Sequence, residues 1–118
     1  MIHLEIDGIP PSLNRWTHLH WTKQRVIKQE WAWLILAACL SAKVGRPMHR
    51  HATITITLAF PVLRRRDFDN YAPKMVMDGL VNAGIIEDDR NDWVKVTWGF
   101  RWAKGEKRRT IIDVVAES

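Results

Sequence analysis

The chain has little cysteine and no long apolar run. Its only cysteine, Cys39, can form no disulfide within the chain and lies in the apolar stretch 31–40, so we expect a reduced, buried thiol. No window approaches the roughly 18 uninterrupted apolar residues that a membrane span requires. The polar residues His3, Glu5 and Asp7 are unlike a signal peptide. We therefore expect a protein of the cytoplasm, with no membrane partner.

The composition also excludes a disordered chain. Hydrophobic residues make up 47% of the sequence and charged residues 26%, which is typical of a soluble globular protein. A length of 118 residues leaves room for one hydrophobic core. Since no repeat, linker or low-complexity tract divides the sequence, we expect a single domain over residues 1–118.

Positive charge is in excess, with 18 Lys and Arg against 13 Asp and Glu. This balance favours a polyanionic partner such as nucleic acid. Carboxylates that hold a divalent cation, beside basic side chains that hold phosphates, are what phosphodiester hydrolysis requires. The alternative is a polar loop between two elements. Seven of the 13 carboxylates lie in one central segment with basic residues around it: Asp67, Asp69, Asp78, Glu87, Asp88, Asp89 and Asp92.

Four segments alternate between apolar and polar residues with a period of two, which predicts β-strands. The last two are joined across a short turn, which predicts a terminal hairpin. The predicted strands cover about 2–7, 53–60, 94–102 and 110–116.

Two segments carry apolar residues at helical spacing. The first covers about 22–44 and is followed by Gly45 and Pro47 as a stop signal. The second covers about 70–83, with Asn70 or Asp69 as N-cap and Gly84 as its C-terminal stop. The order strand, helix, strand, helix, strand, strand predicts an α+β domain. In it, two helices are packed on one face of a small, largely antiparallel sheet.

Seven tryptophans are an unusually large number for this length. We expect most of them in the core, with Trp98 and Trp102 on the buried face of one strand and Trp31 on the apolar side of the first helix. Trp16 and Trp21 lie among polar residues before that helix. They are the better candidates for contact with DNA or with a second subunit.

Asp67 and Asp69 flank Phe68 directly after three arginines. In an extended segment, residues two apart point to the same side about 6.6 Å apart, so both carboxylates could bind a hard cation. A lone Asp-x-Asp is common, and on its own it is more typical of a turn followed by a helix cap. The run Arg64-Arg65-Arg66 is either solvated or a contact with DNA phosphates.

The second helix would carry Asn70, Lys74, Asp78 and Asn82 on one polar stripe. Lys74 would then lie near the helix N-terminus, where free N–H groups and the helix dipole attract anions. Lys74 and this terminus could act together on a phosphate near the acidic pair. The alternative is a solvated Lys74–Asp78 pair that contributes about 0.3 to 0.5 kcal/mol.

Five short motifs form one pattern along the chain: Pro10-Pro11-Ser12 with Asn14, Arg65-Arg66-Asp67-Phe68-Asp69-Asn70, Asp78-Gly79-Leu80, Ala83-Gly84 and Asp88-Asp89. In this order and at this spacing, they resemble the RusA family of Holliday junction resolvases. The resemblance covers nearly the whole chain, and the combined pattern is far more specific than any of its parts. It implies a RusA-like fold, and a homodimer that nicks four-way DNA junctions symmetrically in a bacterial or phage-infected cell.

The resemblance also implies a metal site. Asp67, Asp69 and Asp89 match the family's catalytic, metal-binding carboxylates, and Asp88 is a neighbouring ligand. The implied cofactor is Mg²⁺, for which Mn²⁺ could substitute. Such a metal would stabilise charge on the scissile phosphate and lower the pKa of a bound water for in-line attack.

Lys74 matches the family's catalytic lysine after a one-residue insertion, because the family's lysine falls at the position of Pro73. Asn70 and Asp78 would support the site. Two other functions remain open: a related metal-dependent nuclease for other branched DNA, and a junction-binding protein without catalytic activity. The candidate DNA contacts are Arg64, Arg65, Arg66, Asn14 and Arg15.

Overall fold

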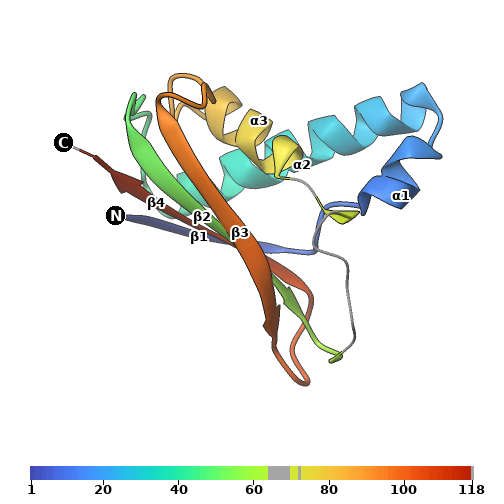
Figure 1. The fold of residues 1–118 in the computed structure, drawn as a ribbon. Helices are drawn as coiled ribbons and strands as arrows, with labels where there is room; N and C mark the ends of the chain where they lie inside the picture. Colours follow the sequence, from blue (N-terminus) through green and yellow to red (C-terminus); the bar gives the residue numbers. More distant parts are fainter. Residues whose placement is uncertain (64–69, 72, 118) are drawn as a thin grey trace.

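The computed structural model describes residues 1–63, 70–71 and 73–117, which form an α+β fold in two layers (Figure 1). One layer is a sheet, and the helices lie together on one side of it. The expected α+β class is confirmed, and a short helix before the first long one is an addition that periodicity did not predict. The elements are β1 (Ile2–Asp7), α1 (Leu13–Thr17), α2 (Trp21–Ser41), β2 (Ala52–Phe60), α3 (Lys74–Asn82), β3 (Val94–Trp102) and β4 (Arg109–Ala116).

The sheet is mixed, with the strand order β1-β4-β2-β3. Strand β4 runs antiparallel to β1 and to β2, whereas β2 runs parallel to β3. The predicted hairpin of β3 and β4 is therefore wrong, because β2 lies between them. A period of two identifies a strand and its faces but not its partner. As the most completely buried strand, β2 takes one of the two interior positions, where both of its edges are paired.

The core lies between the sheet and helices α2 and α3. Trp31, Ile35 and Cys39 recur every four residues on α2 and are buried against the sheet, which confirms the apolar side predicted for this helix. Ile56 and Ile112 are opposite each other on β2 and β4, and both are fully buried. Burial raises the pKa of the Cys39 thiol, since the thiolate loses its hydration. Within the described part of the chain, no helix could cross a membrane.

Strand β3 forms one edge of the sheet, and its exposure differs from the prediction at its end. Trp98 is half-buried as expected, but the side chain of Trp102 is 51% exposed. Figure 1 shows that the end of β3 extends beyond the helices, so nothing from the helical layer covers it. The predicted burial of Trp102 is therefore wrong, because the alternating pattern contained no information on how far the helices reach.

Helix α3 begins four residues later than predicted. Pro73 is its N-cap and makes no side-chain capping bond, and Asn70 lies before the helix. Proline has no N–H to donate within a helix, so it is tolerated only at a helix start, and α3 begins directly after Pro73. The predicted stop is confirmed, because Gly84 has a φ of 76°, a left-handed conformation that glycine adopts easily.

Gly79 lets α3 approach α2 closely. A Cβ at this position would overlap Cδ1 of the fully buried Ile35 and lie 3.3 Å from its Cγ1. We expect Gly79→Ala to lower the free energy of unfolding by about 1 kcal/mol or more, because overpacking costs about 1 to 3 kcal/mol and outweighs the helix propensity of alanine. In an Ile35→Val background, which lacks Cδ1, the same change should be neutral or stabilising. Urea denaturation of all four proteins measures this coupling, and equal losses in both backgrounds would contradict it.

Candidate functional site

The predicted site residues come from three regions of the chain. Asn14 and Arg15 lie on α1, whereas Asn70, Lys74 and Asp78 lie before and on α3. The loop between α3 and β3 carries the second acidic pair, Asp88 and Asp89. Five predicted residues lie outside the described part of the chain, namely Arg64, Arg65, Arg66, Asp67 and Asp69.

A hydrogen bond connects the first two of these regions. The backbone N–H of Asn14 donates to Oδ1 of Asn70 at 3.1 Å, across 56 positions in sequence. Helix α1 is itself fixed by Ser12, whose side chain accepts a hydrogen bond from the N–H of Arg15 at 3.3 Å. Asn14 and Asn70, which belong to two different motifs, therefore meet beside the start of α3.

Lys74 is the first residue of α3. Its Nζ lies 3.8 Å from Oδ2 of Asp78; the Lys74 side chain is largely exposed and that of Asp78 is half exposed. The first turn of α3 carries no acidic residue, and its N-cap is a proline. Because the first N–H groups of a helix lack intrahelical acceptors, this end combines a partial positive charge with the ammonium of Lys74. Its geometry suits a phosphate better than a metal ion.

The loop that follows α3 is held by a stack of cations on Trp93. The guanidinium of Arg50 lies 5.1 Å from the Trp93 ring centroid, and that of Arg90 lies 4.6 Å from it. Arg50 also binds Glu87 at 3.0 Å, and Arg90 binds Asp92 through two hydrogen bonds of 3.1 and 2.9 Å. These bonds hold the pKa of Asp92 below its usual value.

No pattern in the sequence predicted this stack of Arg50 and Arg90 on Trp93. Arg50 precedes β2 and Trp93 precedes β3, and the parallel register that opposes Ala52 to Val94 brings the two side chains together. The predicted pairing of β3 with β4 gave no reason to expect this neighbourhood.

Asp88 and Asp89 are the loop's remaining carboxylates. Both residues are exposed, and Oδ1 of Asp88 accepts a hydrogen bond from the N–H of Asp89 at 2.8 Å. No described basic group forms an ion pair with either one, in contrast to Glu87 and Asp92. Two adjacent carboxylates without a cationic partner are donors that suit a hard cation such as Mg²⁺.

The described residues do not bring all of these groups together. Lys74 begins α3 and the acidic loop follows its end, so the nine residues of this helix, roughly 13 Å, separate them. Figure 1 shows the loop at the end of α3 that lies away from α1. Among the described residues, no three His, Cys, Asp or Glu side chains form a group that could hold a metal. The predicted group also contains Asp67 and Asp69, which lie outside those residues.

Comparison with known proteins assigns no family to this chain. No model of a known protein family matches the chain, and no curated protein matches it.

Proposed function

We propose that the chain is a magnesium-dependent endonuclease that resolves Holliday junctions by paired symmetric nicks. The proposal rests first on the motif pattern that resembles the RusA family. The structural observation that carries it is the hydrogen bond between Asn14 and Asn70, since it joins two motifs of that pattern beside Lys74. The excess of basic side chains suits a DNA partner.

Each group would have a distinct task. Mg²⁺, when bound, supplies a water of lowered pKa and stabilises charge on the phosphate. Asp67, Asp69 and Asp89, with Asp88 as a neighbour, would hold this ion through carboxylate oxygens. Lys74 and the N–H groups at the start of α3 would bind the scissile phosphate and offset the charge that develops on it. Asn14 and Arg15, and the arginines 64–66, would contact neighbouring phosphates of the DNA strand.

The distance between Lys74 and Asp89 makes a homodimer part of this proposal. Because α3 separates the two residues within one chain, a second copy would bring its acidic loop to the start of α3 in the first. A two-fold axis would then create two equivalent sites, as paired nicks require. The dimer is also supported by three exposed apolar side chains at seven-residue spacing along one face of α2, Val26, Trp33 and Leu40, which we call the α2 stripe.

We expect the protein to be a dimer in solution without DNA. Trp33→Glu should shift it to a monomer at micromolar concentration, because a charge would replace the largest side chain of the α2 stripe, which is 65% exposed. Sedimentation velocity measures the state of both proteins. Trp102→Glu is the matched control, since Trp102 is also exposed but lies at the end of β3. A wild-type protein that sediments as a monomer would refute the dimer, and a dimeric Trp33→Glu variant would remove the α2 stripe from its interface.

Mixing two inactive variants tests whether the sites are shared between subunits. In a heterodimer of Asp89→Asn and Lys74→Ala chains, one shared site would retain both wild-type residues. We therefore expect the mixture to nick a four-way junction, although each variant alone should be inactive or strongly impaired. Prior incubation allows the subunits to exchange, and denaturing gels detect the nicks. A mixture no more active than its components, despite demonstrated exchange, would place Lys74 and Asp89 of each site in the same chain.

A panel of synthetic substrates tests the proposed function against its alternatives. Four-way junctions, flaps, forks and linear duplexes are incubated with the protein and Mg²⁺. The proposal predicts preferential cleavage of the four-way junction at symmetric positions. Preferential cleavage of flaps or forks would favour the nuclease for other branched DNA. Tight junction binding without cleavage in either Mg²⁺ or Mn²⁺ would favour the inactive binding protein.

A further inference from the structure

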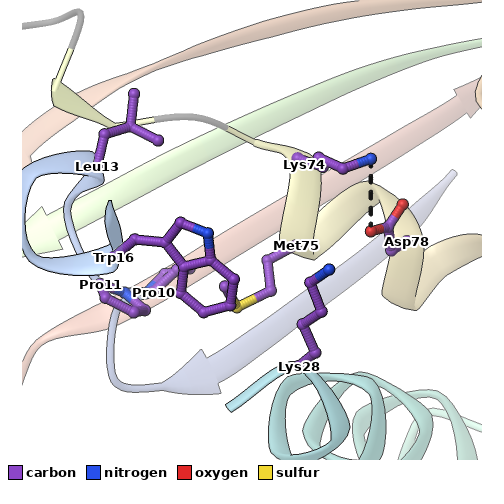
Figure 2. A pocket seen from close by; sticks show the side chains of 8 residues that line it. All are labelled: Pro10, Pro11, Leu13, Trp16, Lys28, Lys74, Met75 and Asp78. Carbon is purple, nitrogen blue, oxygen red and sulfur yellow. Dashed lines mark ion pairs between the residues drawn. The ribbon is translucent and has the colours of Figure 1, made fainter. Parts of the chain in front are cut away.

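A small pocket lies between the turn after β1, helices α1 and α2, and the start of α3 (Figure 2). Its volume is about 150 Å³. Figure 2 shows the indole ring of Trp16 near the Met75 side chain, with Lys74 on one side of Met75 and Lys28 on the other. The lining is mostly apolar and comes from Pro10, Pro11, Leu13, Trp16 and Met75, with Lys28, Lys74 and Asp78 at the rim.

The size and lining of this pocket suit one aromatic ring. A cavity of about 150 Å³ can hold a benzene-sized ligand. Trp16 is half-buried and Met75 is part-buried against the core, so both present apolar surface that is already held in place. Nucleic-acid bases stack on aromatic side chains with little regard to sequence. A nucleobase therefore matches the inner part of the pocket.

The charges at the rim select an anionic ligand. Two ammonium groups and one carboxylate leave one net positive charge. Lys74 is near Asp78 at 3.8 Å, whereas no described carboxylate forms an ion pair with Lys28. The Lys28 ammonium lies 5.9 Å from the Trp16 ring centroid, so one ligand could contact both side chains. A ring that carries a phosphate fits this arrangement.

We propose that the pocket receives one unstacked nucleotide of a branched DNA strand, with its base on Trp16 and its phosphate between Lys28 and Lys74. A base within a continuous duplex is stacked on both faces and is costly to extrude, whereas a base pair at a branch point can lack a stacking neighbour on one face and a bulged base is already unpaired. The inference rests on the proposed function and names the part of the substrate that Lys74 would contact. Helix α1, which lines one side of the pocket, is hydrogen-bonded through Asn14 to Asn70, the residue that follows Asp69.

Photocrosslinking in the absence of metal tests this position directly. The full-length protein is mixed in EDTA with a four-way junction, or with a duplex that has one unpaired nucleotide, and 5-iododeoxyuridine stands at the unpaired or branch-point position. We expect crosslinks to Trp16 or Met75, located by mass spectrometry of the peptides. A fully paired duplex with the same label should give none at these residues. Crosslinks spread over other surface residues, or equal at Trp16 for paired and unpaired labels, would overturn the proposal.

Binding affinities supply a second, independent measure. Trp16→Ala should lower the affinity for branched DNA about 5- to 150-fold, the loss expected for one stacked base, with duplex affinity changed much less. Trp16→Phe keeps a ring and should recover part of the loss. Trp102→Ala, an exposed tryptophan outside the pocket, should leave the ratio of branched to duplex affinity unchanged.

Lys28→Glu keeps the test valid if Trp16→Ala fails to fold, because Lys28 is an exposed residue of α2. It should reduce the ratio of branched to duplex affinity at least fivefold. Lys23→Glu, on the same helix but outside the pocket, should weaken both affinities by the same factor. Equal ratios for the two lysine variants would contradict the proposal. If deoxynucleoside monophosphates bind the pocket at micromolar concentration and branched DNA does not displace them, the ligand is a free nucleotide instead.

The outcomes separate this inference from the proposed function. If the protein nicks junctions in Mg²⁺ but shows neither the crosslink nor the loss of selectivity, the proposed nuclease function stands and the proposed role of the pocket is refuted. If the protein shows both effects but cuts no DNA, the pocket remains a nucleotide site and the proposed nuclease function is refuted.

Discussion

Replacing Asp89 with asparagine should abolish cleavage of four-way junctions and leave junction binding intact or tighter. Its exposed carboxylate forms no ion pair with a described basic residue, so its proposed role is to hold the metal rather than the loop. An amide loses that ligand charge, and it also removes a negative charge that repels phosphate. Asp67→Asn and Asp69→Asn should behave in the same way.

Single-turnover cleavage in Mg²⁺ and binding in EDTA measure the two effects separately. Asp7→Asn is the matched control. Asp7 is an exposed carboxylate at the end of β1, so this substitution makes the same chemical change outside the site. It should cleave at the wild-type rate. An Asp89→Asn enzyme that cleaves at a near wild-type rate would show that Asp89 is not a metal ligand, and the same holds for the other two positions.

Lys74→Ala should slow single-turnover cleavage at saturating enzyme by about 10²-fold or more. Lys74 adds a full charge to the exposed N-terminus of α3, and removing a preorganised charge aimed at the transition state costs on the order of 10² to 10³ in rate. Junction affinity should change much less. Lys74→Arg should recover only part of the rate, because a planar fork does not reproduce a compact ammonium.

Lys95→Ala controls for the loss of one surface charge, since Lys95 is exposed on β3. It should change only the salt-dependent affinity. If Lys74→Ala cleaves normally once saturated, Lys74 is a solvated helix residue paired with Asp78, and another group such as Arg90 supplies the positive charge. That result would also remove the reason for placing the scissile phosphate at the start of α3.

Local patterns predicted the strands closely because a strand's alternation depends on its own residues. The ends of β3 agree with the prediction, and β4 begins one residue earlier, at Arg109. Strand pairing depends on residues far apart in sequence, and the pattern could not show that β2 would separate β3 from β4. The start of α3 was predicted too early because the polar stripe was extended back to Asn70, through Pro73, although a proline is tolerated only at a helix start.

The sequence named candidate site residues, but it could not show how they are arranged in space. Sequence order gave no measure of the separation between Lys74 and Asp89, because that separation follows from the direction of α3 in the crossover from β2 to β3. The pocket beside Lys74 could not be predicted from the sequence either, because it forms only where residues of α1 and α3 meet. Its one signal was Trp16, a tryptophan in polar surroundings that most simply indicated a contact with a partner.

Cleavage of a supercoiled plasmid that extrudes a cruciform tests the central claim most directly. Two nicks made symmetrically within one binding event convert such a plasmid to a linear product, whereas independent nicks first accumulate as open circles. We predict linear product from the outset in Mg²⁺, with ends that map to symmetric positions at the cruciform, and no cleavage in EDTA or by Asp89→Asn. An intact plasmid in both Mg²⁺ and Mn²⁺, or cuts that ignore the cruciform, would contradict the claim that this chain resolves Holliday junctions.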